Sequence, residues 1–155
     1  MGTEYRRASG PLGAAAAVGL LVAAAFAAAP VAAAERTPSA PGAKVYIIAP
    51  ADGATVSSPV LVQFGLSGMG VAPAGIEEAG NSGHHHLLVN KPASDVPMDE
   101  SLPADDNHRH FGGGQTEASL DLPPGEHRLQ LLLADWMHVP HDPPLMSEVV
   151  TITVE

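Results

Sequence analysis

Polar and apolar residues alternate in short runs after residue 43, which is the pattern of half-buried β-strands. The alternation is clear in VVTITV at 149–154 and QTEASLDL at 115–122, and HRLQLLLA at 127–134 is the strongest strand of the set. No segment keeps a helical period, because Pro and Gly interrupt the chain too often. The strands predicted by this pattern are 44–49, 60–66, 84–90, 115–122, 127–134 and 149–154.

Turn residues separate these strands and suggest how they are joined. Pro50 to Gly53 and Leu122 to Glu126 place Pro and Gly where tight turns favour them. The loop 67–83 is too long for a simple hairpin, and such loops tend to be functional or mobile. The pattern predicts an all-β fold, an immunoglobulin-like antiparallel two-sheet sandwich of about six or seven strands, with a small closed barrel as the alternative.

The first 34 residues have the three-part design of a secretory signal peptide. Arg6 and Arg7 form a basic start, an uncharged apolar stretch follows, and an Ala-x-Ala site precedes Glu35. We expect cleavage before Glu35 and a periplasmic or secreted mature protein. A leader retained as a membrane anchor is the alternative, and the arginine pair leaves open whether export is by the general secretory or the twin-arginine route.

The mature chain begins with ERTPSAPGA at 35–43, a polar and Pro-rich segment that predicts a disordered tether. Residues 44–155 then form the predicted β-sandwich domain. This length is ordinary for one domain with one core, and we expect the domain not to be embedded in a membrane.

The mature part is strongly acidic. The whole chain has 7 basic and 17 acidic side chains, and the leader holds two of the basic residues and one of the acidic ones, which leaves a mature formal charge of −11. Such a surface repels nucleic acid and anionic lipid headgroups, so neither is an expected partner. The chain contains no cysteine, so disulfides, thiolate metal sites and thiol nucleophiles are excluded.

The 8 histidines all follow Gly83 and fall mainly into groups. His84 and His86 share one face of a strand while His85 turns to the other, and two imidazoles at that spacing can ligate one ion. The second pair, His108 and His110, repeats the spacing. The expected arrangement is a sheet-end site in which the two pairs meet around copper, zinc or nickel, with Asp105 and Asp106 as additional ligands or hydrogen-bond acceptors. The third group is His138 with His141, next to Met137 and Met146.

Simpler interpretations stay open for several of these residues. His85 among apolar neighbours is more often a buried, hydrogen-bonded core residue, His127 is an ordinary strand residue, and methionines commonly fill cores. Imidazoles beside carboxylates also fit a pH sensor. Gly112 to Gly114 lack the Lys-Ser/Thr of a phosphate loop, so they indicate a tight turn or a close approach, such as one beside the imidazoles.

Long segments of the domain resemble an uncharacterised family of secreted bacterial proteins, the domain of unknown function numbered 4399. These segments are VQFGLSGMGVAPAG at 62–75, GHHHLLV at 83–89, PADDNHRHFGGGQTEASLDLPPGEHRLQLLLAD at 103–135 and HVPHDPPLMSEVVTITV at 138–154. The resemblance implies export and a β-rich domain but no established activity. More loosely, APADGATVSSPVLVQF is similar to the opening of periplasmic copper carriers, which typically begin with His where Glu35 stands here.

The sequence therefore predicts an exported β-sandwich that binds copper or zinc as a carrier, buffer or sensor. The predicted metal ligands are His84, His86, His108, His110, His138 and His141. The alternative is a non-catalytic module that binds a protein or a cell-wall component through its long loops. A metal-dependent hydrolase ranks third.

Overall fold

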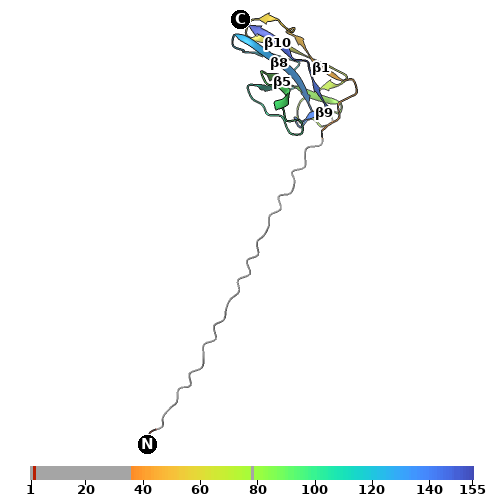
Figure 1. The fold of residues 1–155 in the computed structure, drawn as a ribbon. Helices are drawn as coiled ribbons and strands as arrows, with labels where there is room; N and C mark the ends of the chain where they lie inside the picture. Colours follow the sequence, from red (N-terminus) through yellow and green to blue (C-terminus); the bar gives the residue numbers. More distant parts are fainter. Residues whose placement is uncertain (1, 3–35, 78) are drawn as a thin grey trace. The chain divides into compact units, whose positions relative to one another are not determined.

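A computed structural model describes residues 2, 36–77 and 79–155 (Figure 1). The predicted signal peptide at 1–34 lies outside the described residues, apart from Gly2. Residues 36–77 and 79–155 form ten strands and one 3-10 turn, so the all-β prediction is confirmed. Nothing in the described part of the chain forms a helix of the length and apolar character needed to cross a bilayer.

The ten strands form two sheets that pack as a β-sandwich. The smaller sheet has the order β1-β3-β7; the larger has the order β2-β10-β8-β5-β4, with β6 added to β5 and β9 added to β8. The pairs β2–β10 and β4–β5 are parallel and the others antiparallel. The strands are β1 (Lys44–Ala49), β2 (Thr55–Val56), β3 (Val60–Ser67), β4 (Gly70–Val71), β5 (Ser82–Val89), β6 (His108–His110), β7 (Glu117–Leu120), β8 (Gly125–Ala134), β9 (Pro140–Met146) and β10 (Val150–Val154), with the 3-10 turn η1 (Ala93–Asp95) between β5 and β6.

The described part of the chain has more strands than the six or seven expected. β2, β4 and β6 have only two or three residues each, too few to show an alternating pattern. β9 contains three prolines, which lack the N–H that a ladder needs. It pairs with β8 only near its two ends, with a register shift between them, and this position at the sheet edge is where proline is tolerated.

β5 and β8 are covered on both faces, and this double cover is what buries the histidines. The two strands lie side by side in register (Figure 1), and their side chains alternate between the two faces. On the inner face, Leu87 and Leu131 join the main core with residues of β1 and β3. On the outer face, Leu88 and Leu132 form a second cluster beneath the 91–107 connection, which contributes Val96 and other residues.

Within the segment 35–43, expected to be a disordered tether, residues 36–39 run beside β9. Pro38 forms a parallel bridge with Asp142, and the Ser39 N–H donates to the Asp142 carbonyl at 2.9 Å. Arg36 donates to the carbonyls of Pro140, at 3.1 Å, and His141. These contacts join residues about one hundred positions apart, which is why composition alone did not indicate them.

Candidate metal centre

The two histidine pairs meet on the outer face of the larger sheet. β5 and β6 are antiparallel neighbours in a register that sets His86 opposite His110 and Leu88 opposite His108. His84 and His86 lie on the same face as Leu88, as the strand period predicts, and His85 points to the other side. The imidazoles therefore continue the outer cluster toward the start of β5.

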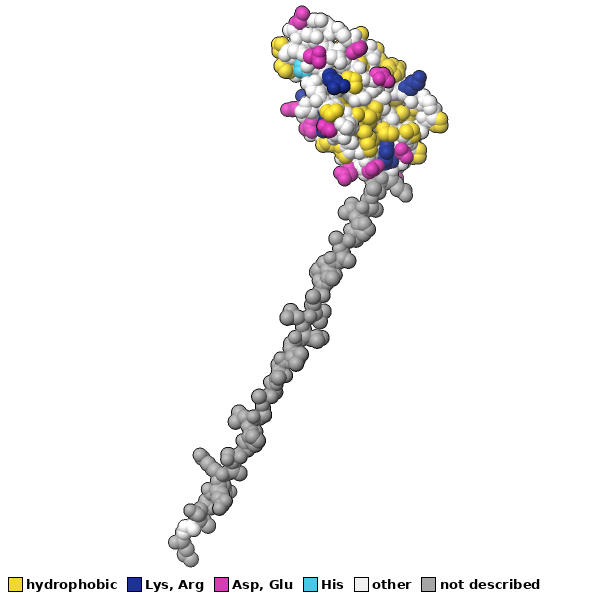
Figure 2. Space-filling view, viewed as in Figure 1, with side chains coloured by type: hydrophobic (Ala, Val, Ile, Leu, Met, Phe, Trp, Pro, Cys, Tyr) yellow, Lys and Arg dark blue, Asp and Glu magenta, His cyan; other side chains and the backbone are white. Residues whose placement is uncertain are grey.

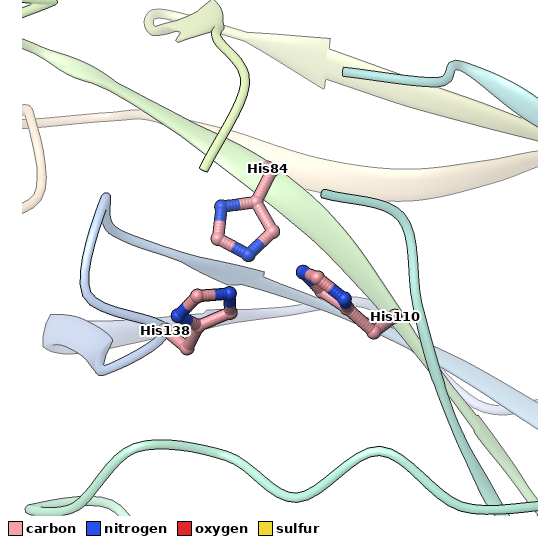
Figure 3. Close-up of side chains that lie close together, drawn as sticks. All are labelled: His84, His110 and His138. Carbon is pink, nitrogen blue, oxygen red and sulfur yellow. The ribbon is translucent and has the colours of Figure 1, made fainter. Parts of the chain in front are cut away.

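Three rings from separate elements come together at this end of the sheet. His84 from β5, His110 at the end of β6 and His138 from the turn before β9 are turned toward one another (Figure 3). One ring nitrogen of each lies within 4.8 Å of the other two. Nitrogens that share one ion at about 2 Å lie about 3–4 Å apart, so this separation is close to a ligand geometry. We call these residues the histidine triad.

The turn that carries His138 depends on a buried carboxylate. Asp135 is 1% exposed, and its Oδ1 accepts hydrogen bonds from the Met137 N–H at 2.9 Å and the Val139 N–H at 3.0 Å. His138 itself has a φ of 68°, in the left-handed region. The His138 carbonyl accepts a hydrogen bond from the Leu102 N–H at 2.9 Å. The turn thus has a defined conformation that carries the His138 ring to the triad.

His86 and His108 extend the triad inward. His86 Nε2 is 3.0 Å from His84 Nε2, and His86 Nδ1 is 3.2 Å from His108 Nε2. The His86 ring centroid lies 4.9 Å from that of His110 and 6.3 Å from that of His138. Both His86 and His108 are fully buried, whereas His110 and His138 are partly exposed, so the site is reached from solvent through the latter two.

Predicted ligand His141 lies apart from the five clustered imidazoles. Its Nδ1 pairs with the Thr37 carbonyl at 3.2 Å, and its ring abuts Gly83, where an added Cβ would lie 2.9 Å from Nε2. His138 and His141 were expected to act together, but His138 lies in the turn before β9 with its ring against His110, whereas His141 lies within β9 with its ring against Thr37. Only His138 joins the triad.

Burial favours the neutral form of four imidazoles in the cluster, those of His84, His86, His108 and His110. Loss of hydration, followed by repulsion from neighbouring imidazoles, lowers the pKa of His84 to about 4 and that of His86 to about 2. Burial also lowers the pKa of His108 and of His110. Neutral imidazole is the form that binds a metal ion, so these four rings need no deprotonation near pH 7.

Several nitrogens in the cluster have no hydrogen-bond partner among the described residues. They are His84 Nδ1, His108 Nδ1 and His110 Nε2, and each is buried. Buried polar atoms are normally paired, so these unpaired nitrogens call for an explanation. A bound cation would satisfy those nitrogens that it coordinates.

The His110 ring occupies space that a side chain at position 112 would fill, so its position requires Gly112. A Cβ on Gly112 would lie 2.4 Å from His110 Cε1 and 2.5 Å from His110 Nε2. The glycine run was predicted to allow a close approach beside the imidazoles, and Gly112 does so. Asp135 was not identified from the sequence, because it acts on His138 through the backbone of a turn and lies among residues that show no ligand spacing.

The residues for which simpler interpretations stayed open, and the two aspartates, lie outside the triad. His85 packs against Phe64 with ring centroids 5.2 Å apart, and its Nδ1 pairs with the Gln115 carbonyl at 3.2 Å. Met146 packs against the outer apolar cluster.

Asp105 and Asp106 are exposed. Asp105 pairs with Lys91 at 4.0 Å, and Asp106 pairs with Arg109 at 3.5 Å. His127 is held by Asn90 and the Pro123 carbonyl. Acidic side chains are also prominent on the face shown in Figure 2.

The fold and the clustered imidazoles together define a β-sandwich protein with a histidine cluster that could hold a metal ion. The chain belongs to the family described as Domain of unknown function (DUF4399), which matches residues 62–155 and so includes every histidine. Comparison with curated proteins and comparison with solved structures find no match. The looser similarity to copper carriers is therefore not confirmed.

Proposed function

We propose that this protein is an exported metal-binding β-sandwich whose triad, His84, His110 and His138, holds copper or zinc. The observation that carries the proposal is the convergence of three ring nitrogens, from three separate elements, to within 4.8 Å of one another. Coordination by imidazole alone suits zinc, copper and nickel, and the chain has no thiolate to favour a softer ion.

Burial and charge support the same function. Burial lowers the pKa of His84 and of His110, which keeps these two rings in the neutral form that binds a metal ion, and the negative charge of the nearby Asp135 favours a cation beside His84. The chain carries a formal net charge of −10, which attracts cations to the domain. We assign it the role of a carrier, buffer or sensor of the ion in the periplasm or outside the cell.

Calorimetric titration of metal-free protein with Zn²⁺ and Cu²⁺ tests the proposal. We expect one ion per chain, and a large loss of affinity in His110→Ala and His138→Ala, whose rings are partly exposed and so least needed for folding. The matched control is His127→Gln, because His127 is held by Asn90 and Pro123. Equal affinity in all four proteins, or no binding by the wild type, would contradict the proposal.

Export is tested separately. Cell fractionation followed by N-terminal sequencing of the protein from the periplasm or medium should give a chain that begins at Glu35. Recovery of the uncleaved chain from the cytoplasm alone would contradict export and leave the metal site unaffected.

A further inference from the structure

We infer that His86 is the fourth ligand of the triad's ion and that His108 positions His86, so that the site is a closed four-imidazole centre. This inference rests on the proposed function, because it concerns the same ion. It decides whether the bound ion has an open coordination position.

The contact between His84 and His86 is the first reason. Their Nε2 atoms are 3.0 Å apart and both side chains are fully buried. Two nitrogen lone pairs at this distance repel each other unless a proton or a cation lies between them. Ligands about 2 Å from one tetrahedral ion are about 3.3 Å apart, so the pair already has nearly the spacing of two ligands of one ion.

The contact between His86 and His108 is the second reason. A histidine that binds a metal through one ring nitrogen usually donates its other N–H to an acceptor, which fixes the ring and the tautomer. With Nε2 on the ion, His86 keeps its proton on Nδ1, which faces His108 Nε2 at 3.2 Å. A His86 ring protonated on Nδ1 can therefore donate to His108 Nε2 and at the same time bind the ion beside His84 through Nε2.

The arrangement of the rings shows which residue must move to close the shell. His86 is 4.8 Å from His84 and 4.9 Å from His110 between ring centroids, but 6.3 Å from His138. His84, His86 and His110 lie on paired strands, whereas His138 is partly exposed and lies on a turn. Movement of the His138 ring therefore completes the shell without any change in the sheet.

A closed shell has a functional consequence. Structural and storage sites commonly fill every position with protein ligands, whereas catalytic zinc sites keep one position for water or substrate. Four imidazoles around the ion favour holding and transferring the metal over metal-assisted hydrolysis.

Cobalt spectroscopy distinguishes a closed site from an open one. The full protein is loaded with Co²⁺, and azide is added while the visible d–d bands are recorded. We expect the wild-type spectrum to be that of a four-coordinate ion and to stay unchanged with azide, and the His86→Phe variant to give a spectrum that azide shifts. His85→Phe is the matched control, since the neighbouring ring faces the other side of the sheet.

His108→Phe tests the positioning role. We expect the wild-type cobalt spectrum with an affinity about 10- to 100-fold lower, because the ligand set is kept while the acceptor for His86 Nδ1–H is lost. An unchanged affinity would overturn the role assigned to His108.

A measurement on the wild type alone covers the case in which His86→Phe does not fold. In ¹⁵N-labelled protein loaded with Zn²⁺, His86 Nε2 should take a metal-bound chemical shift while Nδ1 keeps its proton. An unbound Nε2, or an azide-sensitive wild-type cobalt spectrum, would overturn the inference while the proposed function stands. Absence of any metal binding would defeat both.

Discussion

Asp135 and His138 are coupled through the backbone of one turn. The Asp135 carboxylate accepts the N–H groups of Met137 and Val139, the two residues that flank His138, and the Asp135 carbonyl accepts the His138 N–H at 3.0 Å. The second carboxylate oxygen of Asp135, Oδ2, accepts a hydrogen bond from the Thr37 hydroxyl at 2.6 Å. The position of the His138 ring therefore depends on a carboxylate that acts through the backbone of the turn.

Replacing Asp135 with Asn should weaken metal binding. The amide keeps the size of the side chain but replaces the charged acceptor with a neutral one, so the hydrogen bonds from the Met137 and Val139 N–H groups become weaker. We expect zinc affinity to fall by about 10- to 100-fold, and the free energy of unfolding to fall by about 1–3 kcal/mol.

Competition with a chromophoric chelator measures the affinity, and urea unfolding measures the stability. Asp121→Asn is the control, because Asp121 is exposed and should change neither quantity. An Asp135→Asn protein with wild-type affinity would show that the turn does not control His138.

Gly112→Ala should displace the His110 ring. The new methyl group would lie 2.4 Å from His110 Cε1, too close for the present ring position. We expect a loss of zinc affinity of roughly tenfold or more, equal to about 1.4 kcal/mol. Gly80→Ala is the matched control, since a Cβ there meets nothing within 4 Å. Equal calorimetric affinities for the two variants would refute this account of Gly112.

The predictable part of the fold is the set of strands long enough to show a period. β1, β3, β5, β7, β8 and β10 each overlap a segment predicted from alternation or apolar content. β6 was not predicted because three residues are too few to show an alternating pattern. β9 was not predicted because its three prolines are typical of a loop. The contacts of residues 36–39 with β9 are fixed by tertiary packing, which no local pattern encodes.

The candidate site also has features that the sequence predicts and features that it does not. Alternation on a strand is local, so the shared face of His84 and His86 and the opposite direction of His85 followed from sequence. The alignment of His86 with His110 depends on strand pairing across a connection of about twenty residues. The direction of His138 depends on a left-handed residue in a turn. Neither relationship has a signature in residue spacing.

His85→Phe should leave metal binding intact. The His85 ring lies on the inner face against Phe64, and its buried Nε2 has no hydrogen-bond partner among the described residues. Phe removes that unpaired nitrogen and adds apolar contact, while the Gln115 carbonyl lies in an exposed residue and can bind water. We expect zinc affinity within twofold of wild type, roughly 0.4 kcal/mol, and stability within about 1 kcal/mol. A large loss of affinity, measured by calorimetry, would place His85 in the site instead.

The metal-free protein should lose stability as the pH falls below about 6.5. In the unfolded chain the histidines bind protons near their ordinary pKa, whereas in the folded chain burial lowers the pKa of His84 to about 4 and of His86 to about 2. The unfolded state therefore binds more protons between these values, which favours unfolding by up to about 1.4 kcal/mol per pH unit for each such imidazole. Above that range the rings are neutral in both states, so these groups do not make the stability depend on pH.

Urea unfolding of metal-free protein at pH 5 and pH 8 measures the effect. His86→Phe should reduce the pH dependence, and a wild-type stability equal at the two pH values would contradict the buried neutral cluster.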